Sequence, residues 1–226
     1  PGIIATRMLE SRRERLIAAT LVTIAVPCAS LQAMIWGLLG ARGPQYVALV
    51  YLILFAVWIV LGRILDGLLK GSSPELILEI PAYRIPSWQT VFQKLALRMR
   101  SFFREAAPIV LVGILAVNVL YFFGLFDALA DFTAPVVTKL FGLPKQAVIA
   151  LVIGFLRKDV AIGMLGTLDL TANQLVVSVV ILSMSFPCVA TFSILLKELG
   201  PRGFAFSLTI MLASATIVGT LLNLIL

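Results

Sequence analysis

Two proline–cysteine pairs are the residues of this chain whose types and spacing could do chemistry. Proline has no N–H, so within a helix the carbonyl four residues earlier loses its hydrogen-bond donor. This frees the backbone carbonyls of Thr23 and Ser183, and each pair therefore combines a freed carbonyl, a hydroxyl and a thiol. The pairs lie inside apolar runs, 160 residues apart, and are Pro27-Cys28 and Pro187-Cys188.

This combination of ligands suits one class of cargo. Thiol and oxygen ligands together favour a borderline divalent transition metal over Mg²⁺ or Ca²⁺. Two sulfurs without any histidine are too few for a tight structural zinc site, whereas a weak and transient site is what permeation requires. The alternative is a pair of simple kinks in which each cysteine is a small buried hydrophobe. The candidate metal ligands are Cys28, Cys188, Thr23 and Ser183.

A further candidate lies in a charged run within an apolar stretch. Residues 146–168 are apolar on both sides of Arg157-Lys158-Asp159. Ionisable residues at membrane depth are costly unless they face protein or water, so Asp159 is a candidate site residue. Two arrangements remain open: a pair of short re-entrant helices with the charges at an interface, or a discontinuous helix whose charges line a polar path. The choice decides on which side of the membrane the C-terminus lies.

The elements that must position these residues are membrane-spanning helices. Of the 226 residues, 61% are hydrophobic and only 13% charged, and the mean hydropathy is +1.07, whereas soluble proteins carry about 25% charged residues. We therefore expect an all-α, polytopic transmembrane helical bundle that forms a single domain over 1–226. A soluble enzyme, a nucleic-acid-binding domain and a disulfide scaffold are excluded. The uncharged runs that reach or approach the roughly 20 residues of a membrane span are 16–39, 44–62, 106–126, 170–196 and 203–226.

The basic residues predict the orientation of the first spans. The net charge is +7, but Lys and Arg gather at the ends of spans, so nucleic acid is not the expected partner. Four basic residues in 1–15 and seven in 63–105 are separated by two spans, so both segments lie on one side of the membrane. The positive-inside rule makes that side the cytoplasm and puts the turn at Arg42 outside.

Residues 87–104 predict an amphipathic helix with Ser87 as its N-cap. Its apolar residues recur at helical spacing, and the opposite face carries only cations. One interpretation is a helix packed on the protein's own surface. The other, which we favour, is an interfacial helix at the headgroup boundary. The apolar residues are Trp88, Val91, Phe92, Leu95, Met99, Phe102 and Phe103, and the cations are Lys94, Arg98, Arg100 and Arg104.

The two Pro-Cys pairs belong to a longer internal match at the same offset. Each unit is a helix hairpin with an internal Pro-Cys and a Gly-x-Arg-Gly turn, and transporters built from such repeats bind their cargo where the repeats meet. We expect gate-type repeat units at about 1–70 and 146–226, joined by 71–145, which holds the amphipathic helix and one span. Chance similarity between apolar sequences is the alternative. The further matching pairs are Leu39-Gly40 with Leu199-Gly200 and Arg42-Gly43 with Arg202-Gly203.

A set of motifs runs in order along nearly the whole chain. The most specific are Pro81-Ala82-Tyr83-Arg84-Ile85-Pro86-Ser87-Trp88 and Pro187-Cys188-Val189-Ala190-Thr191. The others are Pro1-Gly2-Ile3-Ile4-Ala5-Thr6-Arg7, Arg12-Arg13-Glu14-Arg15-Leu16, Pro27-Cys28 and Gly154-Phe155-Leu156-Arg157-Lys158-Asp159-Val160. Together these motifs resemble the membrane domain of FeoB ferrous iron transporters.

The resemblance implies Fe²⁺ uptake across a bacterial inner (cytoplasmic) membrane, through two gate repeats whose cysteines are proposed along the iron path. It also implies a cytosolic GTP-binding domain that drives transport. The chain has no Gly-x-x-x-x-Gly-Lys-Ser/Thr loop, so we expect that domain on a preceding segment or a separate chain and expect this chain not to be an enzyme. The repeat likewise predicts that the chain begins partway into its first unit. Fe²⁺ is then the transported substrate, with no tightly bound cofactor.

Three other functions remain open. A gate-repeat carrier of nucleosides or similar solutes would need polar groups around a larger cavity. A non-transporting membrane scaffold would use the basic interfacial helix to recruit lipid or a partner. An intramembrane cysteine enzyme is disfavoured because the chain has no histidine base. The lipid bilayer is a partner in each case, and assembly into a homo-oligomer stays open. The amides that could serve a nucleoside carrier are Asn118, Asn173, Gln174 and Asn223.

Overall fold

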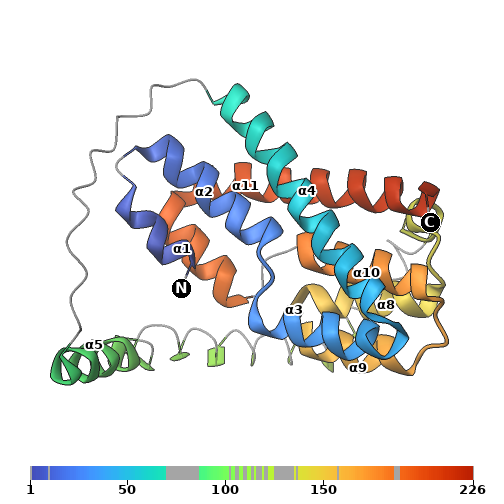
Figure 1. Ribbon diagram of the computed structural model, residues 1–226, viewed down its shortest axis with the longest axis horizontal. Helices are drawn as coiled ribbons and strands as arrows, with labels where there is room; N and C mark the ends of the chain where they lie inside the picture. Colours follow the sequence, from blue (N-terminus) through green and yellow to red (C-terminus); the bar gives the residue numbers. More distant parts are fainter. Residues whose placement is uncertain are drawn as a thin grey trace.

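The chain folds into a bundle of helices, most of which run lengthwise along the molecule (Figure 1). The computed structural model describes residues 2–9, 11–69, 87–101, 137–156, 158–185 and 189–225, together with isolated residues between 103 and 135. Within these ranges no strand occurs, and the all-α prediction is confirmed. Three helical stretches are long and apolar enough to cross a bilayer: 12–42, 44–68 and 194–225. Most of the predicted span 106–126 lies outside the described residues.

The first hairpin is a broken helix followed by a straight one. The Ser11 hydroxyl caps the start of the broken helix by accepting a hydrogen bond from the Glu14 N–H at 3.1 Å. The predicted span 16–39 is two half-helices, because the helix stops before Pro27 and restarts after Cys28. The elements are α1 (Gly2–Ala5), η1 (Thr6–Met8), α2 (Arg12–Ala25), α3 (Ala29–Met34), its continuation through η2 (Ile35–Leu39) and η3 (Gly40–Arg42), and α4 (Pro44–Leu68).

The second hairpin has the same construction. It consists of α10 (Ala172–Met184) and α11 (Val189–Ile225), which is kinked at Gly200. The Thr171 hydroxyl accepts a hydrogen bond from the Gln174 N–H at 3.3 Å, and the Gln174 side chain accepts one from the Thr171 N–H at 3.1 Å. At the offset of 160, α10 begins where α2 begins and α11 begins where α3 begins. The predicted span 170–196 is therefore also interrupted.

The turns of the two hairpins differ from the expected Gly-x-Arg-Gly register. The first hairpin turns at Gly43, with φ 135°, and the second at Gly200, with φ 69°. Each glycine takes a positive φ that other residues rarely adopt, and each directly precedes a proline. Pro44 and Pro201 then open the returning helices at a position where a missing N–H costs nothing. The sequence signal that both turns share is therefore Gly-Pro. At the repeat offset of 160, its position differs by three residues between the two hairpins.

The two hairpins point in opposite directions. In Figure 1 the α3–α4 turn lies at the end of the molecule where the chain finishes, and the α11 kink lies at the end where it begins. Contacts agree, because the Arg42 guanidinium donates to the Leu170 carbonyl at 2.8 Å beside the start of α10. At the other end, Ile3 of α1 packs against Leu195 and Phe204 on both sides of the kink. The arrangement is that of inverted repeats, with the two termini at opposite ends of the bundle.

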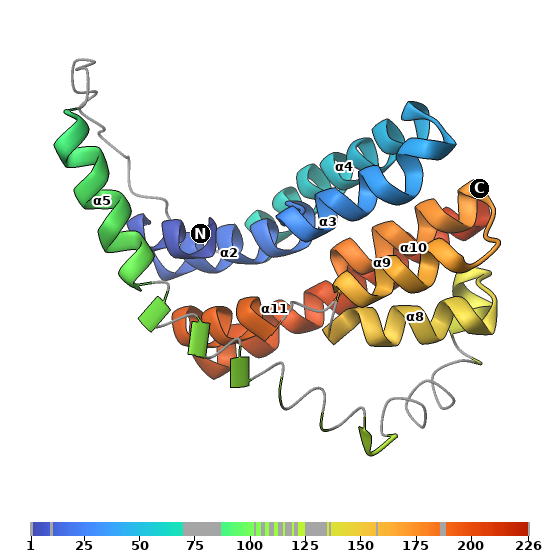
Figure 2. The same cartoon turned by 90° about the horizontal axis from the view of Figure 1, so that it is seen from below.

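A re-entrant helix pair precedes the second hairpin. Its members, α8 (Lys145–Leu156) and α9 (Lys158–Thr167), fold back on each other side by side (Figure 2). The approach is tight, since a Cβ built on Gly154 would lie 2.6 Å from the Ala161 Cβ. Helices of 12 and 10 residues are about 18 and 15 Å long, roughly half a bilayer core. Of the two arrangements that the charged run left open, the structure has the re-entrant pair.

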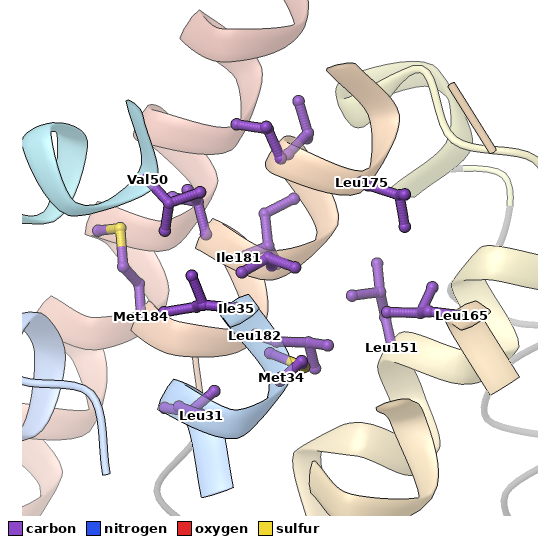
Figure 3. Close-up of a cluster of buried hydrophobic side chains, with 14 of the residues drawn as sticks. Leu31, Met34, Ile35, Val50, Leu151, Leu165, Leu175, Ile181, Leu182 and Met184 are labelled. Carbon is purple, nitrogen blue, oxygen red and sulfur yellow. The ribbon is translucent and has the colours of Figure 1, made fainter. Parts of the chain in front are cut away.

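One buried cluster joins both hairpins and the re-entrant pair, with α10 at its centre (Figure 3). Every residue of α10 from 175 to 184 is buried, as expected of a helix surrounded by other helices. Figure 3 shows Met34 and Ile35 beside Leu182 and Met184, with Leu151 and Leu165 facing the same cluster. Because lipid tails are as apolar as leucine, close packing rather than the hydrophobic effect holds these helices together.

Candidate functional site

One helix of each hairpin breaks on the approach to a proline. The last hydrogen bond of α2 runs from the Val26 N–H to the Val22 carbonyl at 3.3 Å. In α10 the Ser185 N–H donates to the Ile181 carbonyl at 2.8 Å. Both capping residues are extended, with ψ 107° at Val26 and −164° at Ser185. At the repeat offset, the two breaks start within one residue of each other.

The structure brings the two breaks close together. Residues on both sides of the first break, Ile24 and Leu31, share one buried cluster with Leu182 and Met184 at the end of α10. Figure 3 shows Leu31, Met184 and Leu182 in the same part of this cluster. The C-terminal ends of α2 and α10, which are far apart in sequence, therefore lie against one buried cluster, and the two helices are in contact.

The C-terminal ends of α2 and α10 favour the binding of a cation. The C-terminal end of a helix carries about half a negative charge, because its last carbonyls have no intrahelical donor. Here two such ends, those of α2 and α10, lie against the same cluster. Pro27 has no N–H and cannot donate to the Thr23 carbonyl, so that oxygen lacks its usual helical hydrogen-bond donor. Broken helices of transporters bind cations through such ends.

The two candidate hydroxyls lie at equivalent places on the broken helices. Thr23 Oγ1 donates to the Ala19 carbonyl at 2.6 Å, and Ser183 Oγ donates to the Val179 carbonyl at 2.7 Å. Each bond reaches back four residues, so each hydroxyl proton is engaged while the oxygen lone pairs remain able to accept or to ligate. Ser183 is buried and Thr23 is half-buried.

Cys28 lies in the first break as an exposed, free thiol. It is the N-cap residue of α3: its carbonyl accepts from the Gln32 N–H at 2.9 Å, but its side chain makes no capping bond. Cys28 is therefore not buried against the described part of the protein, as the alternative interpretation required. Beside the break is an apolar cavity of about 340 Å³, lined by Ala25, Val26, Tyr51, Leu54, Phe55 and Trp58.

Part of the predicted site lies outside the described residues. This holds for Pro187, Cys188 and Arg157, and for the side chain of Asp159. The candidate ligands that the described part contains are Thr23, Cys28 and Ser183. In that part, no three or more Cys, Asp or Glu residues cluster as a ready metal site. What it offers a metal is one thiol, hydroxyls and helix-end carbonyls.

A buried polar contact was missed from the sequence. Thr20 and Ser207 are each fully buried, and their hydroxyl oxygens lie 2.6 Å apart between α2 and α11. The Thr20 proton goes to the Leu16 carbonyl at 2.7 Å, so Ser207 donates to Thr20. The repeat hides this pair, because the offset maps the two positions onto Val180 and Val47, which are both buried and apolar.

An arginine at the start of α2 binds the end of α4. The Arg13 guanidinium lies 2.5 Å from the Asp66 carboxylate and donates to the Asp66 carbonyl at 2.8 Å. It also donates to the Leu69 carbonyl. A cation that binds the last carbonyls of a helix complements the negative end of its dipole. This contact joins the two helices of the first hairpin at the end opposite the Gly43 turn.

Two family models match the chain. The model described as "Ferrous iron transport protein B C terminus" matches residues 47–98, which include most of α4. The model described as "Nucleoside recognition", named Gate, matches residues 103–202, which include the re-entrant pair and α10. No solved structure matches the chain significantly.

Curated relatives extend the similarity to the whole chain. The Fe(2+) transporter FeoB of Methanocaldococcus jannaschii is 27% identical over 100% of this chain and 39% of its own length. The protein of the same name in Helicobacter pylori is 32% identical over 50% of this chain and 18% of its own, and that of Legionella pneumophila 28% over 74% and 25%. The chain thus spans less than two fifths of these relatives. The comparisons confirm the resemblance to the FeoB membrane domain.

Proposed function

We propose that this chain is the membrane-permeation part of a ferrous iron transporter of the FeoB type, in which Fe²⁺ passes between the inverted repeats. The observation that carries the proposal is the pair of broken helices, α2 and α10, one from each repeat, whose C-terminal ends lie against a single buried cluster. Opposed broken helices at a repeat interface are the usual cargo site of such transporters. The similarity to relatives named Fe(2+) transporter FeoB supports iron as the cargo.

The proposed iron site uses residues of both breaks. Cys28 and Cys188 supply thiolates, whose deprotonation the metal itself favours. The backbone carbonyls and hydroxyls of Thr23 and Ser183 supply oxygen. A mixed set with few sulfurs holds a borderline metal weakly, so the ion can leave as readily as it enters. No cofactor is held tightly, and Fe²⁺ is the substrate.

Asp159 serves the ion path from the tip of the re-entrant pair. It is the second residue of α9, which puts it where α8 and α9 fold back on each other. A carboxylate there would offset the charge of a passing cation. We expect Asp159→Ala to reduce Fe²⁺ flux severalfold. The control is Asp169→Ala, in an exposed loop before α10; equal and mild effects would remove Asp159 from the path.

The proposed partners follow from the relatives. A GTP-binding domain, on a segment that precedes Pro1 or on a separate chain, would drive the gate, and GTP hydrolysis would reside there. The lipid bilayer surrounds the bundle, and a bacterial inner membrane is the proposed location. Assembly into a homo-oligomer is compatible with this scheme, and nucleic acid is not a partner.

A second candidate is a carrier of nucleosides or similar solutes, because the Gate family model carries that description. Such a carrier needs free amides, but the amides of Gln174 and Asn223 are engaged in contacts with backbone carbonyls. Gln174 donates to the Gly142 carbonyl at 3.4 Å, and Asn223 donates to the Leu140 carbonyl at 3.2 Å. The cavity beside the first break is also apolar. These contacts favour iron.

Flux in proteoliposomes tests the proposal. The chain, joined to the GTP-binding domain of a relative, is reconstituted and given Fe²⁺ under reducing conditions or uridine. We expect GTP-dependent Fe²⁺ uptake and no uridine uptake. Uridine uptake without Fe²⁺ uptake would favour the nucleoside carrier, and neither flux would favour the membrane scaffold.

A further inference from the structure

Helix α5 (Trp88–Ser101) is exposed from Trp88 to Arg100. Its large apolar side chains are exposed as well: Trp88 is 78% exposed, Phe92 64% and Leu95 53%. None of the extensive helix–helix contacts among the described residues involves α5. Of the two interpretations drawn from the sequence, packing of the helix on the protein's own surface is therefore not seen in the described part of the chain.

The direction of α5 differs from that of the bundle. In Figure 1 it is seen end-on while α4 and α11 lie in the plane of the picture, and Figure 2 shows it steeply crossed to them. If the bundle helices span the bilayer, α5 lies parallel to the membrane surface. It also lies at the end of the molecule where α1 and α2 begin, which is the basic end.

One face of α5 is apolar and the other is cationic, and both suit a membrane surface. Trp88, Phe92, Leu95 and Met99 recur at the spacing of one helix face. The remaining surface carries Lys94, Arg98 and Arg100, and α5 contains no acidic residue. Its start is fixed by Ser87, whose hydroxyl accepts from the Thr90 N–H at 3.4 Å. One apolar residue lies on the cationic side: Leu97, nine residues after Trp88, is two and a half turns away.

We propose that α5 docks on anionic phospholipid of the leaflet at the N-terminal end of the bundle. Its apolar face enters the headgroup boundary, and its cations bind the phosphates. The occupant is a lipid surface because the exposed face is apolar and every charged residue of α5 is a cation. Each cation near an anionic surface contributes about fivefold to binding, so two of them shift the equilibrium between docked and free helix roughly thirtyfold. This inference needs only a membrane-embedded chain and does not rest on iron as the cargo.

The test uses the full chain with Trp36→Phe and Trp58→Phe, which leaves Trp88 as its one tryptophan. The protein is reconstituted in phosphatidylcholine vesicles with or without phosphatidylglycerol, and quenching of Trp88 by brominated acyl chains is measured. We expect strong quenching that depends on phosphatidylglycerol and is lost in Arg98→Gln/Arg100→Gln. The charge-matched control Arg63→Gln/Arg202→Gln, at exposed arginines outside α5, should retain it.

A second pair of variants separates the two faces. Leu95→Ser should abolish the quenching, whereas Leu97→Ser, on the cationic side, should leave it unchanged. Both side chains are exposed, so neither variant should disturb the bundle. Quenching by aqueous iodide in both kinds of vesicle would show an undocked helix and overturn the proposal. Protection from both quenchers would show α5 packed on protein, and equal lipid quenching without phosphatidylglycerol would show that charge is irrelevant; either result also overturns it.

Discussion

At the scale of single residues, Cys28 is the side chain on which most of the chemistry depends. It occupies the N-cap of α3 without capping it and is exposed in the break between α2 and α3. A residue that served packing would be buried, and one that served the helix would accept a hydrogen bond from its first turn. Neither role applies, so a substitution here can separate metal binding from folding.

We expect Cys28→Ser and Cys188→Ser each to leave the folded yield near normal and to reduce Fe²⁺ flux by at least roughly tenfold, the cost of disturbing a metal ligand's surroundings. Serine keeps the size of the side chain but replaces a soft sulfur with an oxygen that deprotonates far less readily. Cys188 should matter more, because its motif follows the family more closely. Flux is measured in proteoliposomes and yield by size-exclusion chromatography. Normal flux in the double variant would leave both prolines as simple kinks.

The buried Thr20–Ser207 pair gives a second prediction. Thr20→Val or Ser207→Val alone leaves the other hydroxyl without this partner and should cost about 1 kcal/mol in the free energy of unfolding. The double variant should cost less than the sum of the two, because Val180 and Val47 at the equivalent positions are buried and apolar. Thermal unfolding in detergent measures this. Additive losses would show that the two hydroxyls are not coupled.

At the scale of elements, the prolines in the sequence predicted where helices break. The close approach of one helix to another could not be predicted from the sequence. Pro27 and Pro187 marked where the spans of each hairpin are interrupted, because a missing N–H acts locally. The turn register was missed, since the Gly-Pro signal at Gly43 and Gly200 overrides the aligned Gly-x-Arg-Gly. The fold-back of α8 on α9 depends on a long-range contact, so the charged run alone left two arrangements open.

Gly154 should be required for that fold-back. A Cβ at this position would lie 2.6 Å from the Ala161 Cβ and 2.7 Å from a Leu182 methyl. Gly154→Ala should therefore cost about 1–3 kcal/mol, the usual penalty of overpacking, and lower the midpoint of thermal unfolding. Gly163→Ala in α9 is the control, because nothing lies within 4 Å of a Cβ there. Equal effects of the two changes would show that α8 and α9 do not pack at Gly154.

At the scale of the whole molecule, the inverted repeats decide what the sequence left open. The chain begins at one end of the bundle and finishes at the other (Figure 1). The re-entrant pair does not cross, and α11 returns after its kink toward the C-terminal end. The burial of α10 on all sides, which makes it the centre of the bundle, follows from contacts with α2, η2, α4, α8 and α11 and could not be read from hydropathy.

We therefore expect the C-terminus to face the outside and the end of α4 to face the cytoplasm. Fusions of alkaline phosphatase, which is active only outside the cytoplasm, after residue 225 and after Leu68 test this. The first should be active and the second inactive. Green fluorescent protein at the same sites should give the reverse pattern. Activity of both phosphatase fusions, or of neither, would place the two ends on one side and contradict the inverted arrangement.

The central claim is that the two helix breaks form one cation site, and Cd²⁺ block of Fe²⁺ flux tests it most directly. The chain has only two cysteines, so a soft ion held by both thiolates must bridge Cys28 and Cys188. The account predicts that low Cd²⁺ blocks the wild type, that each single serine variant needs at least about tenfold more, and that the double variant is no more resistant than either single one. The same Cd²⁺ sensitivity in all four proteins would contradict it.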